Sequence, residues 1–314
     1  MPAIITDKFR IHNAEQFSEA FTEASGNTMY LGIGRPQAFA TQTRADSRTE
    51  NQGSDTNPIT PADNVNAQTI TFDDMLAAKK VTSSDVTFSI PRRNWTTGTV
   101  YDEYRHDYGE RITGTTTAKT ANSGASTLFD ATFYVLTSAR NVYKCLDNNS
   151  NAASTVEPTG TSTSILSTAD GYKWKYMYTL SASQQANFLS TDFMAVSTDS
   201  TVSSAAVDGA VNIIKIKTAG SGGTDGTHTG VAIRGDGTGG VCSVTVTSGA
   251  VTSVTVTSPG TGYTYGTVSN AQIVAAGATS LVGAELDVII EPKGGHGFNA
   301  VEELGGFYVM LNTS

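Results

Sequence analysis

The feature that most constrains the fold is a repeated strand sequence near the C-terminal end of the chain. The element VTVTS begins at Val244 and again at Val254, and the segment SGAVTS leads from one copy to the other. Valine and threonine alternate, so valine lines one face of each strand and threonine the other. This pattern predicts a β-hairpin. Residues 212–278 around it are dominated by Gly, Thr, Ser and Val, and we expect them to form an inserted all-β module.

Charge and composition narrow the class of protein. Only 16% of the 314 residues are charged, and the formal net charge is −9. An acidic chain lacks the concentrated Lys and Arg that bind phosphates, which argues against nucleic acid as a partner. Ser, Thr, Gly and Asn replace the charged residues and favour strands, turns and extended surfaces. Such compositions are common among proteins of large assemblies.

The chain shows no sequence signal for export or membrane insertion. Its first ten residues lack the basic start and apolar run of a signal peptide, and no stretch approaches the roughly 20 apolar residues that cross a bilayer. We therefore expect a soluble protein made in the cytoplasm, with no membrane partner. Cys145 and Cys242 lie far apart and lack CxxC spacing, so we expect both to be reduced, buried packing residues.

The N-terminal segment predicts a helix packed on a sheet. IITDKFR has a strand signal, after which Asn13 can cap a helix with Gln16 in the capping-box position. The pair Ser25-Gly26 ends this helix, and NTMYLGIG predicts a buried strand.

A polar stretch then predicts a long loop. Residues 35–66 are rich in Asn, Asp, Thr and Pro, and long excursions of this kind in a compact domain are usually functional or bound to a partner. The following FDDMLAAKK is ambiguous, with a short helical pattern whose acidic start and basic end match the helix dipole.

The middle of the chain predicts strands. ATFYVLT and NVYKCLD frame a hairpin turn at SARN. GYKWKYMYTL alternates aromatic and polar residues, and a half-buried strand explains this alternation more simply than a stacking platform for sugars or bases. One face carries Tyr172, Trp174, Tyr176 and Tyr178, and the other carries Lys173, Lys175 and Met177.

The densest group of acid and base side chains does not predict a catalytic site. Its members Asp102, Glu103, His106, Asp107 and Glu110 lie in one segment, YDEYRHDYGER. Ligands from a single loop rarely make a site, and the sequence offers no second cluster to complete one. We therefore expect no catalytic residues, no metal and no cofactor, and thus not an enzyme.

Two further motifs are formal matches only. GDGTGG, with Gly235, Gly237 and Gly240, fits GxGxxG, but a strand sequence follows where a dinucleotide site needs a helix. His296 in GGHG is a lone imidazole among glycines and is more often a turn residue than a ligand.

An ordered set of short motifs resembles a known family. It runs through IITDKFR, NTMYLGIGRPQAF, SIPRRNW, NVYKCLD, STVEPTG and DGYKWKYMYTL. This order resembles a baseplate wedge subunit of T-even-type contractile-tailed bacteriophages, over about the first 180 residues. The C-terminal EPKGGHGFNAVEELGGFYVM is similar to longer versions of this subunit in phages of photosynthetic bacteria. The T-even form lacks the β insertion, and longer relatives extend beyond the apolar FYVMLNTS.

The resemblance implies a structural protein of the virion, assembled in the host cytoplasm. The implied fold is mainly β, with a discontinuous β-sandwich wedge core of residues 1–211 and 279–314 that has an N-terminal helix and long loop excursions. The implied protein is a homodimer within each baseplate wedge, joining neighbouring wedge proteins and moving when the sheath contracts. A tail-tip adhesin that binds cell-surface glycans is the alternative; it would expose its aromatic residues, whereas a wedge subunit would bury them. A polysaccharide-cleaving enzyme would need two carboxylates facing a cleft.

The corner in VTFSIPRRNW is the candidate protein interface. Pro91 fixes the backbone, Arg92 and Arg93 offer planar donors, and Trp95 supplies a large apolar face, a chemistry enriched at interface hot spots. The corner is expected either to pin a long loop to the core or to dock a partner subunit. The competing interpretation is that Trp95 belongs to the core and the arginines pair with nearby carboxylates.

Overall fold

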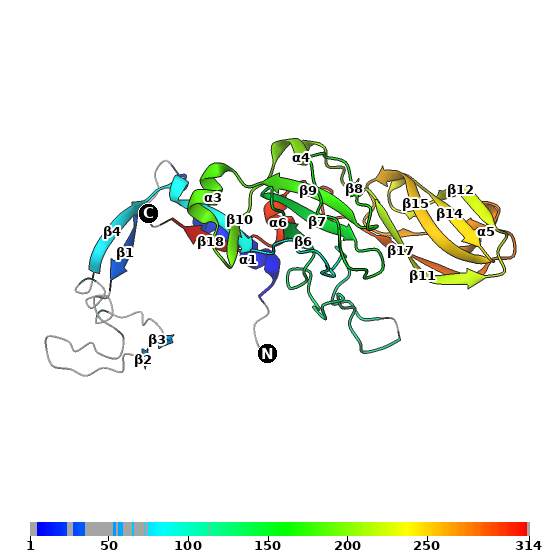
Figure 1. Cartoon of the computed structure of the whole chain (residues 1–314), viewed down its shortest axis with the longest axis horizontal. Helices are drawn as coiled ribbons and strands as arrows, with labels where there is room; N and C mark the ends of the chain where they lie inside the picture. Colours follow the sequence, from blue (N-terminus) through cyan, green and yellow to red (C-terminus); the bar gives the residue numbers. More distant parts are fainter. Residues whose placement is uncertain are drawn as a thin grey trace. The chain divides into compact units, whose positions relative to one another are not determined.

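The computed structural model describes residues 5–23, 28–34, 53–54, 56–58, 65, 72, 75–112 and 114–312. Strands dominate this part of the chain and the helices are short (Figure 1), which confirms the predicted mainly β fold with an N-terminal helix. None of the helices in the described ranges is long and apolar enough to span a membrane. The chain divides into two compact units, one of Met1–Ala14 and Phe88–Tyr308 and the other of Glu15–Thr87 and Val309–Ser314.

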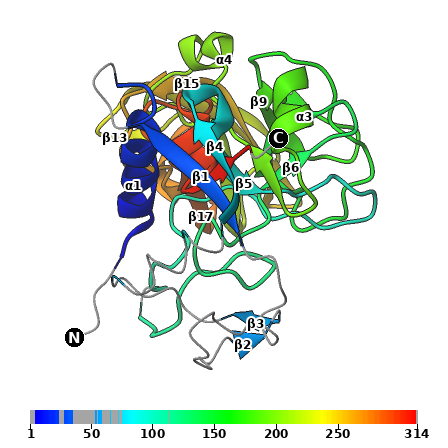
Figure 2. The ribbon, with the colours of Figure 1, turned by 90° about the vertical axis from the view of Figure 1, so that its left-hand side faces the viewer.

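The smaller unit contains a two-stranded antiparallel ribbon. Strand β1 (Met29–Gly34) pairs with β4 (Met75–Val81), and Figure 2 shows the two side by side together with the short hairpin of β2 (Gly53–Ser54) and β3 (Asn57–Pro58). The helical interpretation of FDDMLAAKK is wrong from Met75 onward, because backbone pairing with β1 overrides the local pattern.

The expectation that β1 is a buried strand is also wrong. Tyr30 is 66% exposed and Ile33 is 45% exposed. The ribbon has two strands only, and no residue of β1 is buried. The predicted excursion over residues 35–66 and the helix stop at Ser25-Gly26 lie almost entirely outside the described residues.

Helix α1 (Asp7–Glu19) begins earlier than the sequence pattern predicts. The Thr6 hydroxyl accepts a hydrogen bond from the Phe9 amide at 3.3 Å, and Asp7 lies in the first turn, where a carboxylate complements the helix dipole. The strand expected over IITDKFR is therefore wrong from Asp7 onward. Asn13 does not cap the helix but lies within it.

A four-stranded sheet forms the centre of the larger unit, in the order β6-β7-β9-β8. Its strands are β6 (Tyr134–Leu136), β7 (Asn141–Asp147), β8 (Leu166–Ser167) and β9 (Lys173–Thr179). The predicted hairpin at SARN is confirmed, since β6 and β7 are antiparallel and the Thr137 amide donates to the Asn141 carbonyl at 2.9 Å. Cys145 lies in β7, reduced and fully buried as expected.

Short elements surround this sheet. Strand β5 (Val86–Pro91), preceded by a 3-10 turn at Ser83–Asp85, pairs antiparallel with β10 (Phe193–Ala195). The remaining elements are α3 (Ala182–Phe188), α4 (Ser200–Ser204), α6 (Ala300–Leu304) and β18 (Tyr308–Leu311).

The Gly, Thr, Ser and Val-rich region folds as strands with one short helix. Strands β12, β14 and β15 form one sheet, β11 pairs with β17, and β13 pairs with β16. The bounds are β11 (Ile213–Ser221), β12 (Gly226–Ala232), β13 (Arg234–Gly235), β14 (Thr238–Thr247), β15 (Ala250–Thr261), β16 (Gly266–Thr267), α5 (Asn270–Ala275) and β17 (Val282–Ile289).

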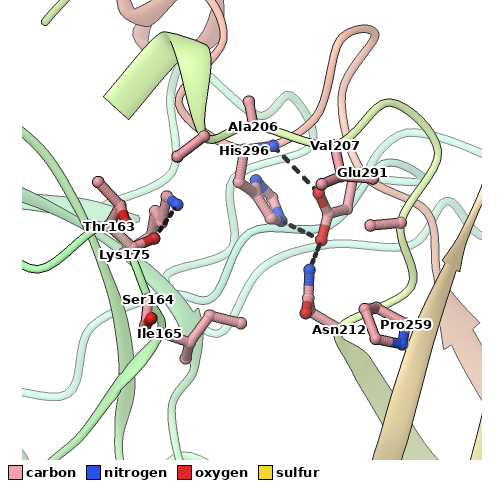
Figure 3. Close-up of a pocket in the computed structure, with 12 residues that line it drawn as sticks. Thr163, Ser164, Ile165, Lys175, Ala206, Val207, Asn212, Pro259, Glu291 and His296 are labelled. Carbon is pink, nitrogen blue, oxygen red and sulfur yellow. Dashed lines mark hydrogen bonds and ion pairs between the residues drawn. The ribbon is translucent and has the colours of Figure 1, made fainter. Parts of the chain in front are cut away.

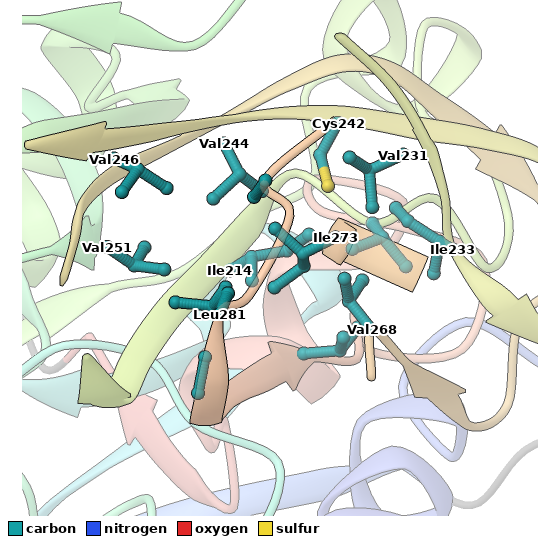
Figure 4. Packing of buried hydrophobic residues seen from close by; sticks show 14 of the residues in the cluster. Ile214, Val231, Ile233, Cys242, Val244, Val246, Val251, Val268, Ile273 and Leu281 are labelled. Atoms are coloured by element: carbon teal, nitrogen blue, oxygen red, sulfur yellow. The ribbon is translucent and has the colours of Figure 1, made fainter. Parts of the chain in front are cut away.

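One apolar cluster holds these elements together (Figure 4). It includes Ile214 from β11, Val231 from β12, Val244 and Cys242 from β14, Val251 from β15, Ile273 from α5 and Val288 from β17. Because the cluster draws on β17, it continues past residue 278. The division into a module of 212–278 and a discontinuous core stays a prediction.

The repeated VTVTS elements form the predicted hairpin. Val244 lies opposite Val254 in the antiparallel register of β14 and β15. Ser248 and Gly249 form the two-residue turn, with φ of 55° and 79°, the left-handed values that such a turn needs. GDGTGG is followed by β14, a strand, so the reason given for rejecting it as a dinucleotide site is confirmed.

Candidate functional site

The predicted corner lies where β5 ends and the chain turns toward β6. The Arg92 amide donates to the Asp192 carbonyl at 2.7 Å, which continues the pairing of β5 with β10. Two further backbone bonds link the corner to Leu136, whose amide donates to the Arg93 carbonyl at 2.7 Å and whose carbonyl accepts from the Trp95 amide at 2.9 Å. The corner is thus held by backbone pairing on both sides.

Arg93 ties a distant segment to the corner. Its guanidinium donates to the Ala131 carbonyl and, at 3.2 Å, to the Phe129 carbonyl, and it stacks over the Tyr134 ring at 4.6 Å. Backbone carbonyls of residues 129–131 therefore take the place of the carboxylates expected in the competing interpretation. This geometry agrees with a corner that pins a loop.

The Arg92 side chain is held less firmly by the rest of the fold than the Arg93 side chain. Its Nε donates to Asn94 Oδ1 at 3.0 Å and its guanidinium to the Ser190 carbonyl at 2.8 Å, both at the surface. Trp95 is half-buried against the aromatic cluster of the sheet, and its indole donates to Ser154 Oγ at 3.1 Å. Of the three predicted interface residues, Arg92 is the one whose side-chain hydrogen bonds are all exposed.

The alternating aromatics of β9 are buried. Tyr172, Trp174, Tyr176 and Tyr178 are each at most 5% exposed, and the Tyr172 and Trp174 rings stack at 5.3 Å. Burial of Lys175 and Met177 on the other face shows that the strand is enclosed on both sides, so the half-buried interpretation is wrong. These rings form core and offer no platform for a sugar.

The acid and base cluster of the 101–111 segment stabilises the fold. Asp102 is buried and accepts hydrogen bonds from the amides of Ser123 at 2.9 Å and Thr132 at 2.7 Å. Burial alone would raise the pKa of Asp102, but these hydrogen bonds hold it below its usual value. The Asp102 carboxylate thus holds together the two loops that contain Ser123 and Thr132.

Other members of that cluster form ion pairs with strands of the β-rich region. Arg105 binds Asp107 at 2.8 Å and also contacts Asp287 in β17. The Lys215 ammonium, in β11, lies 2.8 Å from both Glu103 and Asp147. None of these contacts pairs a nucleophile with a base.

A buried ionic network escaped the sequence analysis. The Lys144 ammonium of β7 binds the Glu303 carboxylate of α6, and both side chains are almost fully buried. Glu303 also accepts from the Gly297 amide at 2.8 Å and the Asn299 amide at 3.2 Å. Burial alone would raise the pKa of Glu303, but the Lys144 charge brings it down to about 2. The sequence signal that could have revealed this network is Lys144, a lysine within a mainly apolar strand.

His296 lies in a turn, as expected, and its side chain is a buried member of this network. Its Nδ1 lies 3.9 Å from Glu303 Oε2 and its Nε2 lies 3.9 Å from Glu291 Oε1, both beyond hydrogen-bond distance. The ring packs edge-on against Tyr104 with centroids 4.8 Å apart. Burial lowers the pKa of His296, and the Lys144 charge lowers it further, so the imidazole is held neutral.

A cavity of 290 Å³ adjoins the network (Figure 3). Lys175 of β9 and His296 lie on opposite sides of it, and the Lys175 ammonium donates to the Thr163 carbonyl. Glu291 lies beside His296 and accepts from the Asn212 side chain and, at 3.0 Å, from the His296 amide. Within the described ranges, no group of three His, Cys, Asp or Glu side chains is arranged to hold a metal ion.

The fold and these sites describe a β-rich structural protein whose polar side chains mainly hold its own segments together. Comparison with known families agrees: residues 3–155 match the family model described as Phage-Gp8: Bacteriophage T4, Gp8. This stretch, just under half of the chain, is therefore similar to a family of phage baseplate wedge proteins. It includes the corner at 91–95 and ends before β9. No curated protein matches the chain.

Proposed function

We propose that this chain is a structural subunit of a phage tail baseplate wedge and joins neighbouring wedge proteins during assembly and sheath contraction. The observation that carries the proposal is the family match over residues 3–155. The burial of the β9 aromatics supports it, because a wedge subunit is expected to bury the rings that a glycan-binding adhesin would expose.

The proposed partners are other baseplate wedge proteins and a second copy of this chain. Within the corner, Arg92 is the residue assigned to partner contact, because its side-chain hydrogen bonds lie at the surface. Arg93 and Trp95 are assigned a supporting role, since their hydrogen bonds to other segments are partly buried, unlike those of Arg92. The relation of the C-terminal segment to longer versions of the subunit remains part of this proposal.

The first experiment measures mass in solution by light scattering, for the protein alone and mixed with the other wedge proteins of the same tail. We expect a dimer that enters a larger complex. Arg92→Ala is expected to weaken complex formation at least about tenfold, the effect of losing one hot-spot side chain. Arg234→Ala, an exposed arginine in β13, is the matched control and is expected to change nothing.

Arg93→Ala separates folding from docking. Loss of its bonds to residues 129–131 is expected to lower the melting temperature, which circular dichroism measures before the mixing experiment. A trimer that ignores the wedge proteins and binds host-cell glycans would overturn the proposal and favour the adhesin. If Arg92→Ala assembles as the wild type does, the proposed role of the corner is wrong, but the proposed wedge function is not affected.

A further inference from the structure

Two buried lysines face each other in the central sheet, and they differ in how their charge is compensated. Lys144 of β7 lies directly opposite Lys175 of β9 in the antiparallel register. Like charges in this position repel, and buried ammonium groups need an anionic partner. Lys144 has the Glu303 carboxylate, whereas Lys175 forms no ion pair with a carboxylate in the described part of the chain.

The Lys175 ammonium is incompletely satisfied where it borders the cavity. The residue is only 6% exposed, and among the described residues its one hydrogen-bond partner is the Thr163 carbonyl. An ammonium carries three N–H donors, so two remain for an occupant of the cavity. Burial lowers the pKa of Lys175, and the nearby charges of Glu291 and Glu303 offset this shift only in part.

The opposite wall offers a second polar contact. His296 Nε2 is 3.9 Å from Glu291 Oε1, too far for a hydrogen bond. The Glu291 carboxylate is already engaged by the Asn212 side chain and the His296 amide. Lys175 and His296 both line the cavity, so a small acid bound there can contact both side chains (Figure 3).

Part of the remaining wall is apolar, and Ser164, Asn212 and Glu291 form its polar part. Ile165, Ala206, Val207 and Pro259 line the cavity, whose 290 Å³ lies near the lower end of the range for small-molecule sites, roughly 300 Å³. A short hydrocarbon stem fits these walls. A phosphate dianion fits less well than a monocarboxylate, because it brings two negative charges instead of one near the buried Glu291 carboxylate.

We propose that the cavity between Lys175 and His296 binds a small monocarboxylate with a short apolar stem. The carboxylate pairs with the Lys175 ammonium and accepts from His296, and the stem lies against Ala206 and Pro259. The negative charge of the ligand compensates Lys175, as the Glu303 carboxylate compensates Lys144.

Isothermal titration calorimetry of the full chain with sodium butyrate tests the proposal. Saturable binding is expected, at least tenfold tighter than that of inorganic phosphate and absent for butylamine. Lack of saturable heat with butyrate would overturn the proposal, as would equal affinity for phosphate.

Three variants locate the site. Lys175→Met keeps the stem of the side chain and removes its charge, and butyrate affinity is expected to fall at least tenfold. Lys173→Met is the matched control on the same strand, because Lys173 pairs with Asp147 at 3.7 Å at the surface; its affinity is expected to be unchanged. Ala206→Phe fills the cavity without touching the ammonium and is expected to abolish binding.

Circular dichroism of each variant shows whether it is folded. If Lys175→Met does not fold, Ala206→Phe decides the question. Butyrate affinity equal to wild type in a folded Lys175→Met or Ala206→Phe would overturn the proposed site.

Discussion

Two regions of the larger unit build their interiors from different chemistry. The β6-β7-β9-β8 sheet and the segment after β17 bury lysine, glutamate, histidine and tyrosine side chains. The cluster between β11 and β17 consists of Val, Ile, Leu and Ala with one cysteine and one tyrosine. Among the described residues, the buried charged side chains all belong to the first region or to the segments around Asp102 and Asp107.

This difference sets how each region responds to change. A buried ion pair contributes only as a complete set, because removal of one member leaves a charge without compensation. An apolar cluster loses stability in proportion to the volume removed. The stability of the sheet is therefore expected to depend on individual charged groups and on pH. The stability of the β-rich region is expected to depend on side-chain size.

The largest effect is expected from Glu303→Gln. It removes the carboxylate that compensates Lys144 in the interior, and the free energy of unfolding should fall by roughly 3–5 kcal/mol. Urea denaturation followed by tryptophan fluorescence measures this, since both tryptophans, Trp95 and Trp174, belong to the sheet region. Glu302→Gln is the exposed control, and a similar loss in both variants would contradict the comparison.

Ile273→Ala tests the apolar region. Ile273 is fully buried in α5, and its truncation should cost roughly 3 kcal/mol, with Ile273→Val costing about 1 kcal/mol. Hydrogen exchange measured by mass spectrometry should show lost protection in β14 and β15 before any loss in β9. Greater loss in β9 would mean that the two regions do not differ as proposed.

Acidification should destabilise the sheet region before it destabilises the β-rich region. The pKa of Glu303 in the folded protein is about 2, below its ordinary 4.5, so its contribution is present above pH 4.5 and is lost as pH falls toward 2. At pH 4 the resulting loss in the free energy of unfolding is about 1 kcal/mol. His296 acts in the same direction, because its lowered pKa keeps it neutral while the unfolded chain takes up a proton below about pH 6.5.

The ionisable groups that face His296 include Lys144, Glu291, Glu303 and the Tyr104 phenol. Urea denaturation at several pH values, with hydrogen exchange corrected for intrinsic rates, measures this acid sensitivity. Stability that is constant between pH 7 and pH 4 would contradict it. His296→Gln is expected to remove the part of the loss that begins near pH 6.5.

The smallest effect is expected at the hairpin turn. Gly249 has a φ of 79°, which an alanine adopts with strain, so Gly249→Ala should cost about 1 kcal/mol. Ser248→Gly at φ 55° relieves such strain and should be neutral or stabilising. Thermal denaturation measures both, and a neutral Gly249→Ala would show that the turn does not direct the register.

Local patterns predicted much of the fold. The hairpin at Val244 and Val254 followed from alternation and a turn sequence, and the β6–β7 hairpin from two strand patterns around SARN. Predictions were wrong where a distant strand or a nearby cap decided the outcome. Met75 is in a strand because β1 pairs with it, and α1 begins at Asp7 because Thr6 provides a cap.

The predicted site was recovered only in part. The sequence brought together Arg92, Arg93 and Trp95, but their hydrogen-bond partners, such as Ser190 and Ser154, lie far away in the chain. The network around His296 was missed because Lys144 lies in β7, far along the chain from Glu291, His296 and Glu303, which follow β17.

The sequence by itself determined the mainly β class, the alternating strands and the β14–β15 hairpin, because strand period and turn conformation depend on neighbouring residues. Tertiary structure alone decided which charges are buried. Lys175 and Lys173 occupy the same strand two residues apart, yet Lys175 is buried beside a cavity and Lys173 reaches solvent. That distinction arises from what packs over each side chain, and those covering segments come from distant parts of the chain.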